Sequence, residues 1–173
     1  MATSATRAQE ILNASFGKGR NPAVQLLQGT IVEVVEPKTA PADGSDGRAI
    51  CMRFRTDRTF DETSGRAETQ PGVAAAMLDA VCANAVVLHS SLKKTVATLE
   101  QQCSFLEPIP PERDLFATAT LLRMGRRVAF LKAELRLGDA HDGPLLARST
   151  QTNSLLDLPE PRSKAKSSAP AKL

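Results

Sequence analysis

Hydrophobic and polar positions alternate along six stretches of the chain, as they do in β-strands with one buried face. Between the second and third stretch the pattern changes to an almost uniformly apolar run at 72–90, long enough for about five helical turns. Pro71 precedes this run and suits the first turn of a helix, where its missing N–H is not needed. The predicted strands lie at 29–35, 48–60, 95–105, 115–124, 128–137 and 144–155.

Turn-forming residues separate the later stretches and predict short connections between antiparallel strands. Gly125, Arg126 and Arg127 indicate a hairpin turn, and residues 138–143 indicate a second turn. Because the helix is apolar on nearly all sides, we expect a sheet to curl around it and bury it all round. The order of elements therefore predicts an α+β fold, with a curved antiparallel sheet wrapped around one long central helix.

The charge of the chain is concentrated at one end. The sequence of 173 residues has a formal net charge of +3, yet residues 1–159 carry equal numbers of basic and acidic side chains. A neutral body with 3% aromatic residues and no Trp or Tyr counts against a nucleic-acid binder. No run approaches the roughly 20 apolar residues of a membrane span. We expect an N-terminal helical segment at 1–28, a folded domain at 29–157 and a disordered basic tail at 158–173.

The final three residues, Ala171, Lys172 and Leu173, resemble the small–basic–leucine address for peroxisomes. A disordered tail would leave this tripeptide free for an import receptor, although such an ending also arises by chance. We therefore expect a peroxisome or a related organelle such as the glycosome, and otherwise the cytoplasm.

The cysteines favour no redox or metal chemistry. Cys51, Cys82 and Cys103 are odd in number, widely spaced and set in apolar runs. This pattern is typical of buried reduced thiols, and less so of a disulfide framework or a metal site. We expect no metal and no organic cofactor.

One charge stands out within the predicted helix. Asp79 is the only Asp, Glu, Lys or Arg between Glu68 and Lys93. A buried carboxylate without partners is unfavourable, so Asp79 is a candidate functional group. The alternative is that Asp79 faces solvent on one exposed stripe, with Asn84 and His89 nearby in the sequence.

The start of the same helix offers a second candidate group. Its free N–H groups and positive dipole end can stabilise an oxyanion close to Gly72. Gly72 and Asp79 are about 10 Å apart along the helix axis, so one helix cannot bring both to one reacting carbon. Two antiparallel helices across a dimer two-fold axis can, which predicts an active site shared between two copies of the chain.

Four segments together carry a family resemblance: PGVAAAMLDA at 71–80, FLEP at 105–108, GRRVAF at 125–130 and GPLLARSTQT at 143–152. In this order and spacing, they resemble the hotdog-fold acyl-CoA thioesterases of the phenylacetate-degradation type. The resemblance runs from about Gly29 to Thr152. It implies a hotdog fold, an acyl-CoA substrate and a homo-oligomer, either a dimer or a dimer of dimers.

The resemblance also implies roles for single residues. Asp79 matches the general base or nucleophile of the family, and Thr98 matches a hydroxyl residue that helps to hold the water. The oxyanion side departs from the family pattern: Gln70 and Pro71 stand where the family has His and Gly, and Ser64 stands loosely where it has Asn. Because proline has no N–H, the backbone at Gly72 or Val73, or the Gln70 side chain, would have to donate instead.

Two further segments match the coenzyme A contacts of the family. The implied contacts are Phe105, Glu107, Pro108, Arg123, Gly125, Arg126 and Arg127. Arg126 and Arg127 could meet the nucleotide phosphates, because arginine binds phosphate by bidentate hydrogen bonds. The alternative is a solvated hairpin turn.

The sequence therefore predicts an acyl-CoA thioesterase that hydrolyses the thioester to a free acid and coenzyme A. The alternative is a non-catalytic acyl-CoA-binding hotdog protein with a degenerate oxyanion site. A hydratase of the same fold is a third reading, although no Asp/His pair has a convincing helical-turn spacing.

Overall fold

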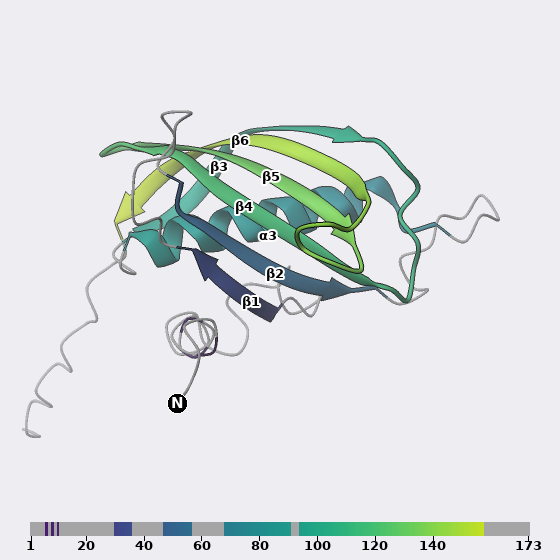
Figure 1. The fold of residues 1–173 in the computed structure, drawn as a ribbon. Helices are drawn as coiled ribbons and strands as arrows, with labels where there is room; N and C mark the ends of the chain where they lie inside the picture. Colours follow the sequence, from purple (N-terminus) through teal and green to yellow (C-terminus); the bar gives the residue numbers. More distant parts are fainter. Residues whose placement is uncertain are drawn as a thin grey trace, which may run out of the picture.

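Figure 1 shows a computed structural model of the chain, in which an antiparallel sheet curves around a long helix. The structure describes residues 6, 8, 10, 30–35, 47–56, 68–90 and 94–157. The elements are β1 (Thr30–Val35), β2 (Ala49–Arg55), α3 (Pro71–His89), β3 (Lys94–Phe105), β4 (Asp114–Met124), β5 (Val128–Leu137) and β6 (Leu145–Asp157). The strand order in the sheet is β1-β2-β4-β5-β6-β3. The predicted curved sheet around one central helix is confirmed.

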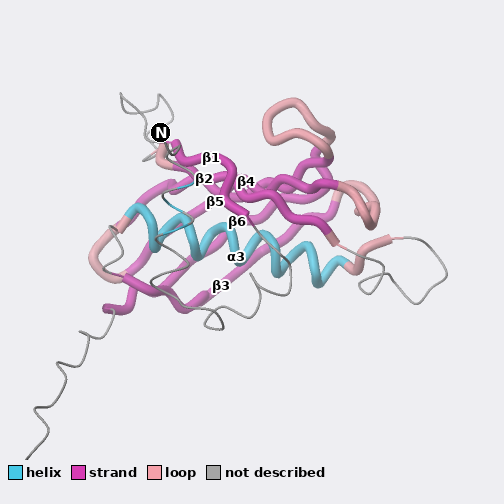
Figure 2. Tube along the Cα trace, turned by 90° about the horizontal axis from the view of Figure 1, so that it is seen from below, coloured by secondary structure: helices cyan, strands magenta, loops and turns pink. Residues whose placement is uncertain are grey.

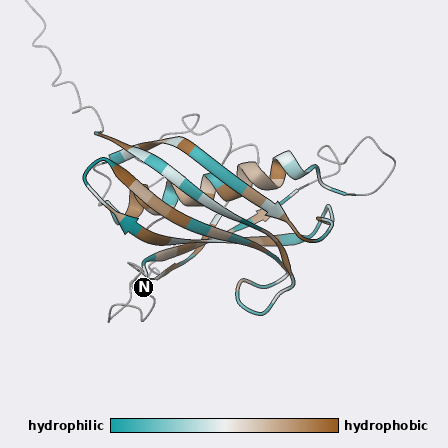
Figure 3. Ribbon diagram, turned by 90° about the horizontal axis from the view of Figure 1, so that it is seen from above, coloured by the Kyte–Doolittle hydropathy of each residue, from teal (hydrophilic) through white to brown (hydrophobic). Residues whose placement is uncertain are grey.

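Alternation of apolar and polar side chains explains why these segments form strands. On β4, Leu115, Ala117, Ala119 and Leu121 are fully buried against the helix, while the residues between them are partly exposed. Figure 3 shows the same alternation of apolar and polar residues along the strands. The predicted strand bounds agree closely with the observed ones, except that residues 57–60 lie outside the described part of the chain.

Local contacts mark where α3 begins and where it ends. Pro71 occupies the first turn, and the Val73 N–H donates to the carbonyl of Gln70 (2.9 Å). At the other end, the Arg48 guanidinium donates to the carbonyl of His89 (2.8 Å), which satisfies a carbonyl that has no partner within the helix. The Arg48 contact ties the end of α3 to the residue that precedes β2.

Helix α3 is long and apolar enough to cross a membrane by length and composition, with a mean hydropathy of 1.7 over an 18-residue window. The sequence-based expectation that no run approaches a membrane span is therefore corrected. In the structure the helix lies against the sheet, and residues on that side such as Met77, Leu78 and Val81 are fully buried. These contacts identify it as the core helix of the domain.

The expectation that α3 is buried all round is only partly correct. Ala75, Ala76, Asp79 and Ala83 are half-buried, and Gly72 is exposed. We call these five residues the open stripe of α3. The open stripe does not coincide with the alternative stripe through Asn84 and His89, because both of those side chains are buried.

Strand β3 forms one edge of the sheet. It pairs with β6 along its whole length and has no strand on its other side in the part of the chain that the structure describes (Figure 2). A bulge between Thr98 and Glu100 leaves Leu99 63% exposed. A long edge of this kind presents unpaired backbone N–H and C=O groups, which are a template for pairing with another chain.

Several expectations fall outside the described residues. Ser64, the tail at 158–173 with its final tripeptide, and most of the segment at 1–28 are among them. The domain boundaries and the organelle address therefore stay predictions.

The turn before β6 gives a stability test. A Cβ atom on Gly143 would lie 2.1 Å from the carbonyl oxygen of Leu137 and 2.7 Å from that of Asp139. Because backbone must move to relieve such contacts, we expect Gly143→Ala to lower the free energy of unfolding by about 1–3 kcal/mol in urea titrations. Gly72→Ala is the control, since nothing lies within 4 Å of its added Cβ. Equal stability of the two variants would contradict this packing.

Candidate active site

The centre of the candidate site is the carboxylate of Asp79, which bonds to side chains from two strands. Thr98 Oγ1 donates to Asp79 Oδ1 (2.7 Å), and Gln151 Nε2 donates to the same oxygen. Gln151 Nε2 also donates to Thr98 Oγ1 (3.0 Å), which closes a ring of three hydrogen bonds. Asp79 is therefore neither an unpaired buried charge nor a solvated surface residue.

The fold explains how these three residues meet. Thr98 lies on the edge strand β3, Gln151 lies on β6 beside it, and Asp79 lies on the helix that crosses the inner face of both strands. Gln101 Nε2 also donates to the carbonyl of Ala75 (3.0 Å), so β3 holds the helix at two levels. The predicted pair of Asp79 and Thr98 is brought together by these contacts.

The first turn of α3 is the second part of the candidate site. Pro71 has no N–H and the Val73 N–H is bonded to Gln70, so Gly72 is the first residue of the helix whose N–H has no partner within the helix. No acidic residue lies in this turn, and the space beside Gly72 is open among the described residues. The positive end of the helix is therefore accessible, although Gly72 lies two turns from Asp79 on the same chain.

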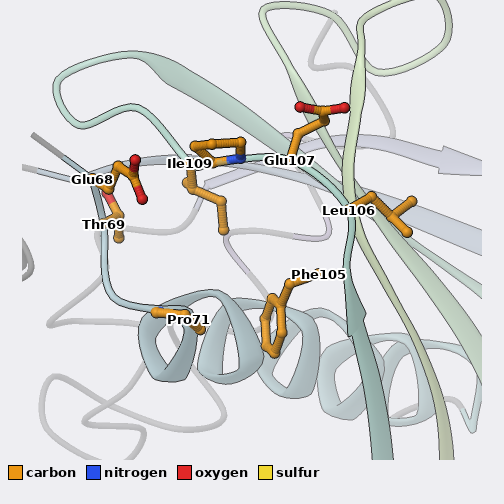
Figure 4. A pocket seen from close by; sticks show the side chains of 8 residues that line it. Glu68, Thr69, Pro71, Phe105, Leu106, Glu107 and Ile109 are labelled. Atoms are coloured by element: carbon orange, nitrogen blue, oxygen red, sulfur yellow. The ribbon is translucent and has the colours of Figure 1, made fainter. Parts of the chain in front are cut away.

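A pocket of about 260 Å³ lies next to this first turn (Figure 4). Phe105 extends from the end of β3 over the helix close to Pro71, and Glu107 and Pro108 continue the wall. The full lining is Glu68, Thr69, Pro71, Phe105, Leu106, Glu107, Pro108 and Ile109. The predicted contacts at 105–108 thus form one pocket, which does not include Asp79.

The predicted arginine contacts lie elsewhere. Arg126 and Arg127 form the exposed turn between β4 and β5, where the carbonyl of Arg127 accepts from Leu155 N–H (2.8 Å). Phe105 pairs with Ala147 at the other end of β6. Since Ala147 and Leu155 are about 26 Å apart at the usual rise of a strand, one chain does not bring the two groups of contacts together. Arg123 and Gly125 are exposed at the same end as the turn.

Sequence reasoning did not assign a role to Gln151. The signal was present, because alternation along β6 places Ser149, Gln151 and Asn153 on the inner face. All three are buried, whereas the inner positions of β4 and β5 are apolar. A polar inner row next to the helix that carries the single charge was the available indication.

This chain is similar in sequence and in structure to known thioesterases. The thioesterase superfamily matches residues 71–143, which include α3, β3, β4 and β5. A thioesterase from Haemophilus influenzae is 19% identical, with a TM-score of 0.67, and the match covers 94% of this chain and 97% of that one. A search of curated sequences finds no match.

Two phenylacetic acid degradation proteins are also similar. A thioesterase-like protein of that kind from Ralstonia eutropha is 26% identical over 82% of this chain and 96% of its own, with a TM-score of 0.63. The PaaI protein of E. coli is 14% identical over 88% of this chain and 96% of its own, with a TM-score of 0.67. This chain has the hotdog fold that these thioesterases share. The resemblance inferred from the sequence is confirmed.

The three cysteines of this hotdog domain have raised thiol pKa values. Burial raises the pKa of Cys82 and of Cys103, and the negative charge of Asp79 raises both further. Burial is also the main cause at Cys51, where Glu33 and Asp139 add to the increase and a hydrogen bond from Thr118 opposes it. All three thiols are free, and Cys103 is the partly exposed one.

Alkylation of these thiols tests the charge on Asp79. In Asp79→Asn the pKa of Cys103 should fall, so its thiolate fraction at pH 8 rises and iodoacetamide should label it faster than in the wild type. Cys51 is the internal control, because Asp79 is not among the charges that raise its pKa. Peptide mass spectrometry reads both rates. No change at Cys103, or an equal change at Cys51, would contradict the predicted proximity of the charge.

Proposed function

We propose that this chain is an acyl-CoA thioesterase. Asp79 either takes a proton from water as the water attacks the thioester carbonyl carbon, or attacks that carbon itself to give a mixed anhydride that water then hydrolyses. In both routes the C–S bond breaks, coenzyme A leaves as a thiolate that takes up a proton, and the acyl group leaves as a free carboxylate.

The observation that carries this proposal is the way Asp79 is held. Both hydrogen bonds from the described residues end on Oδ1, which leaves Oδ2 available to water or substrate. A carboxylate fixed in this manner, half-buried and placed on a rigid helix, suits general-base or nucleophilic work. The match to the thioesterase superfamily supports the reaction class.

A second copy of the chain would complete the site. The edge of β3, which has no paired strand among the described residues, lies on the same side of the domain as the open stripe of α3, since Ala75 and Asp79 both bond to β3 or its neighbour. Antiparallel pairing of β3 with the β3 of a second copy would extend the sheet and set the two α3 helices antiparallel. The open stripe would then be covered.

The levels of the helix and the strand agree with such a pairing. Asp79 bonds at the level of Thr98 and Ala75 at the level of Gln101, so α3 runs antiparallel to β3. By extension Gly72 lies about one residue beyond Gln101. A two-fold axis near Glu100, the middle of this interval, would therefore place the Gly72 N–H of one copy level with Asp79 of the other.

The same symmetry would bring the coenzyme A contacts together. A two-fold axis across β3 reverses the strand direction, so the 105–108 pocket of one copy approaches the end of the partner that carries the Arg126–Arg127 turn. The carboxylates of Glu68 and Glu107 make the pocket unsuited to phosphates, and it would take the uncharged arm of the substrate. The exposed arginines would take the nucleotide phosphates.

A non-catalytic acyl-CoA-binding protein is the second candidate, and Pro71 is the observation that favours it. Proline removes one N–H from the first turn, where the family places an oxyanion donor. The open space beside Gly72 supports catalysis instead, because a thioester oxygen can approach that N–H.

Thiol release from a panel of acyl-CoAs separates the two candidates. We expect Asp79→Asn to lower kcat by about 10²- to 10⁴-fold, because the base or nucleophile is lost. Asp114→Asn is the control: its carboxylate forms an exposed ion pair with Arg55 (3.4 Å), and kcat should stay at the wild-type value. Equal activity of wild type and Asp79→Asn would exclude the proposed mechanism. Binding of acyl-CoA by wild type without turnover would favour the second candidate.

A further inference from the structure

Gln151 occupies the most constrained position around Asp79. Strand β6 is paired on both sides, with Leu131 of β5 and Gln101 of β3 directly opposite Gln151. The side chain points to α3 and only 3% of the residue is exposed. Thr98, the other residue that bonds to Asp79, lies on the uncovered edge strand beside a bulge and is exposed. Of the two residues that bond to Asp79, Gln151 is therefore the one whose backbone is fixed by strands on both sides.

The hydrogen-bond chemistry fixes the direction of each bond in the ring. An ionised carboxylate only accepts, so Gln151 must present its NH₂ group to Asp79 Oδ1. The Thr98 hydroxyl gives its single hydrogen to the same oxygen and accepts the second N–H of Gln151 (3.0 Å). All three donor hydrogens of the ring are therefore used. Rotation of any one of the three side chains would break at least one of these hydrogen bonds.

We propose that Gln151 is the positioning residue for Asp79. It holds Oδ1 in the ring and thereby directs Oδ2 toward the reacting water or thioester. The inference rests on the proposed function, and it assigns Gln151 an indirect part in catalysis through the orientation of the carboxylate. An error of about 1 Å in the placement of a reacting group can lower the rate by roughly 100-fold, so such a residue matters for kcat.

Folding stability alone does not explain a glutamine at this position. The Gln151 Oε1 atom is buried and has no hydrogen-bond partner among the described residues, which destabilises the folded state. A methionine would fill a similar volume without burying an unpaired carbonyl. The amide at this position is therefore accounted for by its two donor hydrogens, both of which act on the Asp79 site.

The strand also provides a matched control. Asn153 follows two residues later on the same inner face, is fully buried, and has no partner for either atom of its amide within the described part of the chain. No hydrogen bond between described residues joins it to Asp79. Asn153→Leu and Gln151→Met each replace a buried amide by an apolar group of similar size, but only Gln151→Met removes a hydrogen bond to the carboxylate, together with one to Thr98.

Steady-state kinetics of the full chain test the proposal. We expect Gln151→Met to lower kcat by about 10- to 100-fold with KM within about threefold of wild type, and Asn153→Leu to keep wild-type kcat. In an Asp79→Asn background, Gln151→Met should cause little further loss, because the two residues act as a unit. A wild-type kcat for Gln151→Met, a loss confined to KM, or an equal loss in both backgrounds would overturn the assignment.

A second measurement separates this proposal from the proposed function. Urea unfolding of wild type, Asp79→Asn, Gln151→Met and the double variant gives the coupling between the two side chains without any need for turnover. If wild type hydrolyses no acyl-CoA but the coupling is present, the proposed function fails. The contact between Gln151 and Asp79 is then purely structural, which overturns the positioning role. If wild type is active but the coupling is absent, only the Gln151 assignment fails.

Discussion

A charged carboxylate in the middle of an apolar helix is the constraint on which this domain depends. Helix α3 has to be apolar because the sheet wraps around it, and Asp79 is the one acidic side chain that it carries. The cost of removing that charge from water is offset by Thr98 and Gln151, which donate to one of its oxygens from adjacent strands. The inner faces of β3 and β6, which lie beside the Asp79 carboxylate, carry polar side chains. The inner faces of β4 and β5, which lie away from it, are apolar.

The same arrangement explains why one chain is insufficient for the proposed chemistry. The helix that carries Asp79 also carries the Gly72 N–H, which has no partner within the helix, and the rise of a helix keeps the two groups about 10 Å apart. The contacts expected for coenzyme A are likewise divided between opposite ends of β6. Among the described residues no strand pairs with the outer edge of β3, which lies next to the open stripe of α3. A second copy that pairs there about a two-fold axis would resolve both separations.

The fold could be predicted from the sequence because its signals are local. Period-two alternation marked the strands, Pro71 marked the start of α3, and Gly125–Arg127 marked a hairpin. The strand order could not be predicted, because pairing of β3 with β6 joins segments some 50 residues apart in the chain. Asp79 was identified as an isolated charge, whereas alternation along β6 indicated only a polar inner row, and the pairing of β6 with β3 was needed to place Gln151 of that row beside Asp79. Burial of Asn84 and His89 also depended on which side of α3 the sheet covers.

Subunit complementation tests the central claim, a site built from Asp79 of one copy and Gly72 of the other. Gly72→Asp puts a carboxylate where an oxyanion would form, and it suits the helix because the space is open and the dipole end is positive. Mixed at random with Asp79→Asn, two inactive chains should regain about a quarter of wild-type activity, since half of the dimers are mixed and each has one intact site. No recovery in dimers shown to be mixed would contradict the claim, because a site contained within one chain stays defective in both.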